Sequence, residues 1–343
     1  MQLDERKKRI LRAIIDDYVR TASPVGSRTI SGKYMLGLSS ATIRNEMSDL
    51  TELGYLEQPH VSAGRVPNAK AYRLYVDSLH EAEPMPAAQA ERIRRDLMGR
   101  VKQVNDVVNS MAEALSELTQ YPSVVMMPKQ EELRINSLHL VPISRASALI
   151  VVVTDGGIIR DAMLHVSDML DHDGLYAISR MLSDRLRGQT LHEAQKLLKS
   201  FSRQAPLDPQ VLGGIAELAA QLERQSASDS LRVAGSHNML RYPEYADVNK
   251  ARDMMSALDQ TDSLLSLLKA DADGGLSVRI GPESGLPRMA DLSIVTCSYE
   301  MGRGHRGAIG VIGPTRMPYR EVLDTLSVAG RTLSQILITP NDE

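Results

Sequence analysis

The sequence contains one cysteine, Cys297, no tryptophan and one phenylalanine among its 343 residues. A single cysteine excludes an internal disulfide framework and a thiolate metal cluster. Because aromatic residues make up only 3% of the chain, stacking of bases on aromatic side chains is not a favoured way to hold nucleic acid. No apolar run approaches the roughly 20 residues that span a bilayer, and the N-terminus has no hydrophobic leader. We therefore expect a cytoplasmic protein with no membrane partner.

The chain also lacks a strong net charge. The formal net charge is -3 at pH 7, which argues against a protein that coats polyanions by charge alone. Residues 1–80 nevertheless carry 12 Lys and Arg against 9 Asp and Glu, whereas the remaining residues carry 28 against 34. A mildly basic head on an acidic remainder favours site-specific DNA binding.

The motifs of common enzyme classes are missing. The sequence has no G-x-S-x-G, H-E-x-x-H or G-x-x-x-x-G-K pattern, and these patterns mark hydrolases, zinc proteases and phosphate-binding loops respectively. The segment from Gly302 to Gly307 matches G-x-G-x-x-G, but strand-like residues follow it where a dinucleotide site needs a helix. We therefore expect a glycine-rich hairpin there. No enzymatic activity, catalytic residue, cofactor or metal ligand is predicted.

The most informative stretch is residues 24–67. Residues 40–53 are predicted to form an amphipathic helix, since Ile43, Met47 and Leu50 recur along one face. A shorter helix over 26–34 and a turn at 36–38 precede it, and a glycine and a short hairpin follow it. Helix, turn, helix and hairpin is the order of a winged helix-turn-helix, whose second helix enters the DNA major groove.

Polar groups at the start of this helix are candidates for DNA contact. The N-terminal end of a recognition helix meets base edges; an arginine matches the O6/N7 pair of guanine and an asparagine matches adenine. A glycine-containing hairpin near position 64 would place an arginine near the wing tip, for a phosphate or a narrow minor groove. The alternative is a polar face that contacts only water. The candidate DNA-binding residues are Ser40, Thr42, Arg44, Asn45, Arg65 and Arg28.

The first predicted helix, residues 3–21, is basic in its first half. Its apolar residues fall on one face, while Arg6, Lys7, Lys8, Arg9 and Arg12 crowd the beginning. These cations either belong to a solvated helix start or contact DNA phosphates. The sequence leaves both interpretations open.

Beyond residue 80 the patterns predict a linker, a long helix and a mixed α/β region. Apolar residues from Ile93 to Leu118 recur at steps of three and four, close to a heptad stripe. This stripe faces either a second subunit or its own domain. Strand patterns occur between 135 and 166 and again between 277 and 312, with mostly helices between them, including one over 209–225. Such an order indicates one α/β domain interrupted by an insertion.

The motifs of this chain resemble those of the HrcA family of heat-inducible transcription repressors. The resemblance rests on SSATIRNEM followed by LGYLEQPHVSAGRVP near the N-terminus, and on GHRGAIGVIGPTRMPYREVL near the C-terminus. It implies an α+β multidomain fold with an N-terminal winged helix-turn-helix and a GAF-like α/β central domain interrupted by an inserted dimerisation domain. The expected parts are a winged-helix domain at 1–80, a linker at 81–90, the first part of the GAF-like domain with a long connecting helix at 91–204, the insertion at 205–276, and the second part of the GAF-like domain at 277–343.

The same resemblance implies a function. It predicts a homodimer that represses heat-shock chaperone operons by binding double-stranded DNA at an inverted-repeat operator, known as CIRCE. It also predicts that this activity depends on the GroEL chaperonin. The alternative is a winged-helix regulator controlled by a small-molecule ligand in its GAF-like domain.

Overall fold

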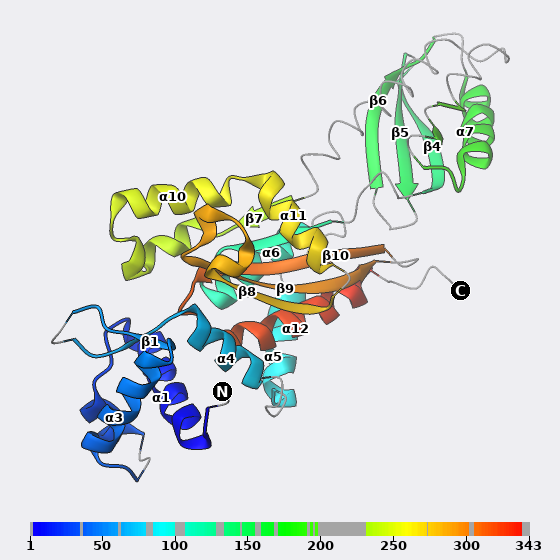
Figure 1. Cartoon of the computed structure of the whole chain (residues 1–343). Helices are drawn as coiled ribbons and strands as arrows, with labels where there is room; N and C mark the ends of the chain where they lie inside the picture. The colour runs from blue at the N-terminus through cyan, green and yellow to red at the C-terminus, as the bar shows by residue number, and fades with distance from the viewer. Residues whose placement is uncertain are drawn as a thin grey trace.

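A computed structural model describes most of the chain. The described residues are 3–34, 37–60, 63–79, 85–99, 107–127, 134–144, 146–154, 159–167, 171–190, 193–194, 196–197, 231–272, 274–301 and 305–337. The chain has three parts: the head (3–79), the body (85–127 together with 231–337) and the inserted unit (134–197). Figure 1 shows the head at the N-terminal end, the body around a central sheet, and the inserted unit with its own sheet and helix.

The head has the predicted order of helices and strands. Its elements are α1 (Glu5–Thr21), α2 (Ser27–Lys33), α3 (Ser40–Glu52), β1 (Leu56–Glu57), β2 (Val66–Pro67) and α4 (Ala69–Leu79). The two short strands pair antiparallel, and an isolated bridge joins Val25 to Arg65. Ile43, Met47 and Leu50 are buried on the inner face of α3. The winged helix-turn-helix arrangement is therefore confirmed.

The body is built on a five-stranded antiparallel sheet of order β7-β3-β10-β9-β8. Its strands are β3 (Ser123–Met126), β7 (Leu231–Ala234), β8 (Leu276–Ile280), β9 (Leu292–Met301) and β10 (His305–Pro314). β9 and β10 pair along their whole length, with His305 opposite Met301. The glycine-rich segment therefore joins two strands of a hairpin, as predicted, although residues 302–304 lie outside the described part.

Helices cover both faces of this sheet. The body helices are α5 (Ala87–Met98), α6 (Val107–Thr119), α10 (Val248–Leu258), α11 (Thr261–Asp271) and α12 (Tyr319–Leu337). Adjacent residues of β9 point to opposite faces, as in any strand. Cys297 lies against α12 at Gly330, whereas the Thr296 hydroxyl donates to Asp271 of α11 at 2.9 Å. Among the short 3-10 helices, η4 (Pro243–Tyr245) and η5 (Gly281–Ser284) lie in the body.

The long connecting helix is not continuous. α5 ends at Met98 and α6 begins at Val107, and the two helices contact each other and α12. In one continuous helix those two ends would lie about 13 Å apart, too far for such a contact. Part of the expected linker, residues 87–90, belongs to α5, whereas 81–84 lie outside the described residues. The described residues of the stripe pack within the chain's own body, where Leu97, Met111 and Leu115 are buried, whereas Val101 and Val104 lie outside the described residues.

The insertion lies earlier in the chain than predicted. The inserted unit consists of β4 (Ile135–Ser144), β5 (Ser147–Thr154), β6 (Ile159–His165) and α7 (His172–Leu186). These strands form a separate three-stranded sheet, and their buried side chains form a core distinct from that of head and body.

The strands that flank the insertion explain the difference. β3 and β7 are neighbours in the body sheet, with Ser123 opposite Ala234, so the chain leaves and re-enters the sheet at one place. Residues 231–272, which were expected within the insertion at 205–276, instead pack in the core of the body. The remaining part of that expectation, including the helix over 209–225, lies outside the described residues.

Candidate nucleic-acid interface

The first turn of α3 is organised by a serine cap. The Ser39 hydroxyl accepts a hydrogen bond from the backbone N–H of Thr42 at 3.1 Å and lies 2.9 Å from the Thr42 hydroxyl. This is the usual way to satisfy a donor at a helix start. Ser40 opens the helix and is half-buried, as is Thr42. The Thr42 hydroxyl therefore stabilises the start of α3. Any contact of Thr42 with DNA must be made while its hydroxyl stays close to that of Ser39.

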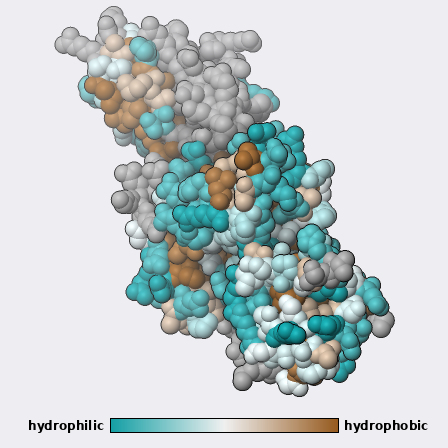
Figure 2. Space-filling model, turned by 90° about the vertical axis from the view of Figure 1, so that its left-hand side faces the viewer, coloured by the Kyte–Doolittle hydropathy of each residue, from teal (hydrophilic) through white to brown (hydrophobic). Residues whose placement is uncertain are grey.

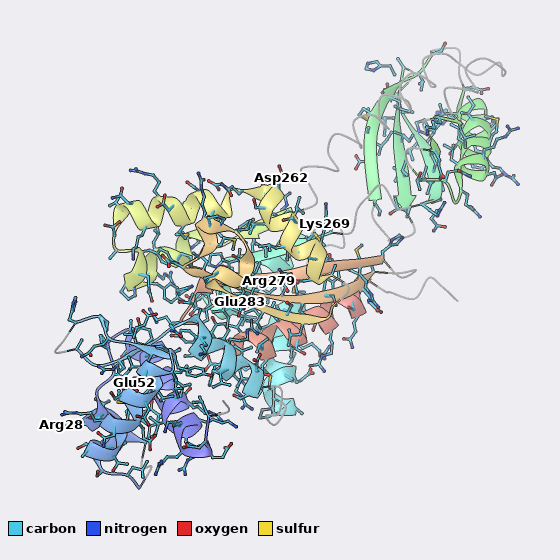
Figure 3. The ribbon with its side chains drawn as sticks, in the orientation of Figure 1. Arg28, Glu52, Asp262, Lys269, Arg279 and Glu283 are labelled. Atoms are coloured by element: carbon cyan, nitrogen blue, oxygen red, sulfur yellow. The ribbon has the colours of Figure 1, made fainter. Side chains whose placement is uncertain are left out.

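Three of the predicted DNA-contacting side chains are free to reach a ligand. Arg44 and Asn45 in α3 and Arg28 in α2 are exposed, and within the described part of the chain no hydrogen bond or ion pair engages them. Figure 3 places Arg28 on the side of the head away from the body. The helix-turn-helix thus presents two guanidinium groups and one amide that would contact DNA without first breaking an internal interaction.

Arg65 lies at the base of the wing rather than near its tip. Its backbone N–H and C=O both pair with Val25 at 2.9 Å, and its side-chain Nε donates to the Thr51 hydroxyl of α3 at 2.9 Å. The side chain is half-buried. The expected position near the tip is therefore wrong, because the strand pairing extends back to Val25 and includes Arg65.

The wing tip itself carries other polar groups. Exposed Gln58 and His60 precede the turn, where the Gln58 amide donates to the Ala63 carbonyl at 3.2 Å. Gly64 is required here by space: a Cβ would lie 2.4 Å from the Val25 carbonyl oxygen. Gly64 therefore lets two backbones approach closely.

Two of the basic residues of α1 hold the recognition helix in place. Lys7 Nζ lies 2.7 Å from Glu46 and 2.9 Å from Asp49, and Arg6 Nε lies 2.7 Å from Glu46. Hydrogen bonds from these carboxylates raise the pKa of Lys7 above its ordinary value of 10.5. Arg6 and Lys7 therefore bind α3, a role that neither interpretation made from the sequence included. Sequence reasoning missed Glu46, although an acidic residue beside Met47 on the apolar face of a helix signals a buried ion pair.

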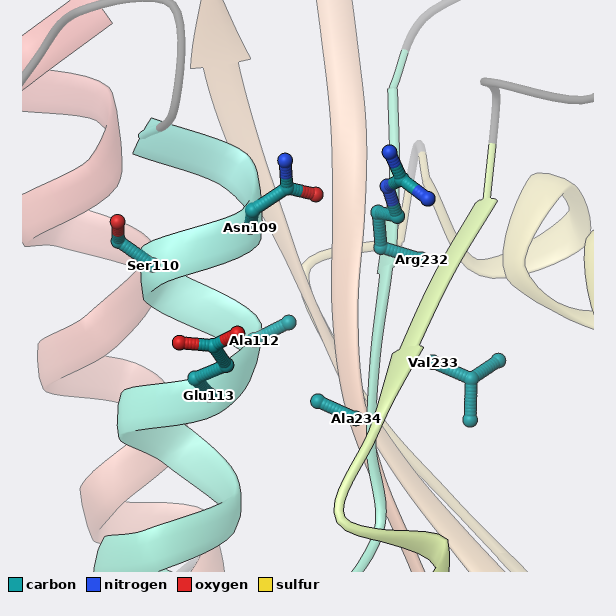
Figure 4. A pocket seen from close by; sticks show the side chains of 7 residues that line it. All are labelled: Asn109, Ser110, Ala112, Glu113, Arg232, Val233 and Ala234. Carbon is teal, nitrogen blue, oxygen red and sulfur yellow. The ribbon is translucent and has the colours of Figure 1, made fainter.

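The body has a groove that bears on the small-molecule alternative. It lies between α6 and β7, has a volume of about 440 Å³, and is lined by Asn109, Ser110, Ala112, Glu113, Arg232, Val233 and Ala234. Figure 4 shows Asn109 extending from α6 toward Arg232, while Val233 points away from the helix. The groove thus combines polar side chains from two elements at a concave surface, which is where small molecules bind in proteins.

The described ranges also bear on metal binding and on membrane insertion. No group of three or more His, Cys, Asp or Glu side chains gathers there to hold a metal ion. Asp271 is buried and binds Arg279 at 2.6 Å. In the same ranges no helix combines the length and apolarity that crossing a bilayer requires.

Family models match both the N-terminal and the C-terminal part of the chain. Residues 2–79 match the family model "Winged helix-turn-helix transcription repressor, HrcA DNA-binding", and residues 105–323 match "HrcA protein C terminal domain".

Full-length relatives are also found. The heat-inducible transcription repressor HrcA of Pelotomaculum thermopropionicum is 38% identical, covering 98% of this chain and 97% of its own. The protein of that name from Symbiobacterium thermophilum is 39% identical, covering 97% and 98%. A crystal structure of a hypothetical protein at 2.2 Å shares the fold, with a TM-score of 0.74, 22% identity, and coverage of 98% of this chain and 99% of that one.

Proposed function

This chain belongs to the HrcA family of heat-inducible transcription repressors, and we propose that it represses heat-shock chaperone operons by binding an inverted-repeat CIRCE operator as a homodimer. Its family is one of transcription repressors with a DNA-binding winged helix. The observation that most directly supports sequence-specific DNA binding is the exposed N-terminal end of α3. There Arg44 and Asn45 have no internal partner within the described chain.

The geometry supports base reading by these two residues. α3 enters the major groove with its N-terminal end first in proteins of this architecture. Arg44 would then contact a guanine and Asn45 an adenine, in the bidentate geometries that discriminate these bases. Phosphates would be contacted by Ser40, Thr42 and Arg28. Arg65 would either contact a phosphate or hold the wing against α3.

The inserted unit supports the dimer. α7 packs along β4, the edge strand of its sheet, where Leu138 and Leu140 donate backbone N–H hydrogen bonds to Ser183 and Ser179. The face of the sheet opposite its buried core carries exposed apolar side chains. Val141, Ile143 and Met163 are 43%, 57% and 56% exposed. Figure 2 shows apolar residues on the side of this unit that faces the viewer. Such a concentration of exposed apolar residues marks an interaction surface, and a second copy of the same face would cover it in a two-fold dimer. The inserted unit would then be the dimerisation domain, within a GAF-like body.

We propose that the repressor depends on the GroEL chaperonin because this chain belongs to the HrcA family. Heat would reduce the fraction of folded, binding-competent dimer, and GroEL would restore it. The alternative is a winged-helix regulator controlled by a small-molecule ligand, for which the groove between α6 and β7 is a candidate site.

The proposal is tested by fluorescence anisotropy with labelled duplexes. We expect tight binding to the CIRCE inverted repeat, weaker binding to a single half-site, and the weakest binding to a scrambled duplex of equal length. A sedimentation experiment on the same samples should show two chains per operator. Equal affinity for all three duplexes would contradict sequence-specific repression.

A further inference from the structure

The head meets the body at a junction where one arginine binds both parts. Arg316 lies between β10 and α12, and its side chain is only 9% exposed. Nη2 and Nε donate to the two carboxylate oxygens of Glu244 in the body, the first at 3.0 Å. Nη1 donates to the backbone carbonyl of Val19 in the head at 2.9 Å. One guanidinium group therefore joins a body carboxylate to a head helix.

The Val19 carbonyl is an acceptor that a helix cannot satisfy by itself. α1 ends at Thr21, and the last four carbonyls of an α-helix have no partner within the helix. This end of the helix also carries partial negative charge, which attracts a cation. The fork of donors on Arg316 can bind Glu244 in two places and Val19 at the same time, whereas a lysine would present only a point charge.

A second arginine crosses the junction in the opposite direction. Arg73 belongs to α4 of the head, and its Nε donates to Glu283 of the body at 2.9 Å. Its Nη2 donates to the other oxygen of Glu283 and, at 2.6 Å, to the backbone carbonyl of Val278 in β8. The same carboxylate accepts the backbone N–H of Ile280 at 2.9 Å, which fixes it beside β8. Figure 3 shows Glu283 on the side of the body next to the head.

Packed side chains fill the space that these arginines flank. The rings of Tyr72 in α4 and Tyr319 in α12 lie 5.8 Å apart, and both side chains are fully buried. The apolar core runs without interruption from the head into the body. Two polar anchors on different helices of the head, together with a packed contact, prevent the rotation that one attachment would allow.

α1 transmits this constraint to the recognition helix. It is 17 residues long, or about 25 Å. Arg316 binds Val19 near its C-terminal end, and Lys7 near its N-terminal end binds Glu46 of α3. The orientation of α3 is thereby fixed relative to the body.

We infer that Arg316 and Arg73 are positioning residues for operator recognition, which set the distance and the angle between the two recognition helices of a dimer. This inference rests on the proposed dimeric repressor. Half-sites on DNA repeat with the helical turn of about 10.5 bp, so two added base pairs rotate one half-site by about 70° relative to the other. Heads fixed to their bodies cannot follow this rotation, whereas freely jointed heads can.

The experiment compares four duplexes: a single CIRCE half-site, the intact inverted repeat, and two repeats whose spacer is lengthened by two or by four base pairs. Anisotropy is measured for the wild type, for Arg316→Gln, for Arg316→Lys and for Arg331→Gln. The control is matched, because Arg331 is exposed on α12 and donates only to Ser327 of its own helix among the described residues. Thermal unfolding of each variant verifies that it is folded.

We expect the wild type and Arg331→Gln to bind the lengthened repeats at least about tenfold more weakly than the intact repeat. Arg316→Gln should keep the half-site affinity within about twofold while this spacer penalty falls below about threefold, and Arg316→Lys should lie between. Should Arg316→Gln not fold, Arg73→Gln supplies the same test, since Arg73 is 32% exposed.

Two results would overturn the inference. One is a folded Arg316→Gln or Arg73→Gln variant with the wild-type spacer penalty. The other is an equal loss on half-site and inverted repeat, which would mean that the arginine only stabilises the fold. A wild type that binds the intact repeat no better than scrambled DNA would instead contradict the proposed function, so the two failures are distinguishable.

Discussion

Replacing Gly64 by alanine should damage the wing through a clash between backbones. The added Cβ would lie 2.4 Å from the Val25 carbonyl oxygen and 2.5 Å from its carbon, where an unstrained contact needs about 3.5 Å. The two segments must then separate by roughly 1 Å, which would break the two hydrogen bonds between Val25 and Arg65, each now 2.9 Å long, because bonds much beyond 3.2 Å weaken steeply. At about 1 kcal/mol for each bond, the free energy of unfolding of the head should fall by about 2 kcal/mol.

The measurement is urea denaturation of the full chain, followed by circular dichroism, with operator affinity measured on the same samples. Gly32→Ala is a matched control, because no atom lies within 4 Å of its added Cβ. Gly32 also lies within α2, where alanine is favoured over glycine by up to about 1 kcal/mol. An unchanged unfolding free energy for Gly64→Ala, or an equal loss in the control, would refute the role given to the Val25–Arg65 pairing.

Three further predictions concern the DNA interface and the dimer. Arg44→Ala or Asn45→Ala should weaken operator binding by about 1–3 kcal/mol for each lost bidentate contact; titration against scrambled DNA should show no matching loss, and an equal loss would identify the residue as a phosphate contact. Glu46→Gln should lower stability and alter its pH dependence: the raised pKa of Lys7 means that the ion pair stabilises the fold below about pH 10.5 and stops doing so as pH rises through the higher folded-state pKa. Denaturation between pH 8 and pH 12 (roughly the range in which lysine titrates) should therefore show a steeper loss in the wild type than in Glu46→Gln, and parallel curves would contradict the pairing. Met163→Asp should convert the dimer to a monomer in sedimentation velocity, and a persistent dimer would place the interface elsewhere.

The head could be predicted because its determinants are local in the sequence. The apolar stripe of α3, the serine cap before it and the glycine after it lie within 16 residues of one another, from Ser39 to Gly54. Periodicity and capping report such features directly. The exposed positions of Arg44 and Asn45 follow from the same helical period, since the buried face determines the exposed one.

The division of the body could not be predicted in this way. Whether residues 135–165 or 231–234 join the main sheet depends on pairing between β3 and β7, and a strand pattern does not name its partner. Both segments show strand character, so their assignment to one sheet or two was open to error. The resemblance to a family indicated that an insertion exists, but the motifs that carry it lie outside the inserted unit.

Several functional roles depended on contacts over long distances in the sequence. Arg316 binds partners that lie 72 and 297 residues away, and Arg65 binds Thr51 across the hairpin. In the sequence each appears only as an arginine in a turn. Their roles come from the orphan carbonyls and buried carboxylates that folding brings to them.

We propose that this chain is a dimeric repressor that reads an inverted repeat through α3. The most direct measurement is an anisotropy titration of the CIRCE repeat against a scrambled duplex, before and after mild heating, with and without GroEL and ATP. We expect specific binding before heating, a loss on heating, and recovery only when the chaperonin is present. Binding that does not distinguish the repeat from scrambled DNA in any of these conditions would contradict it.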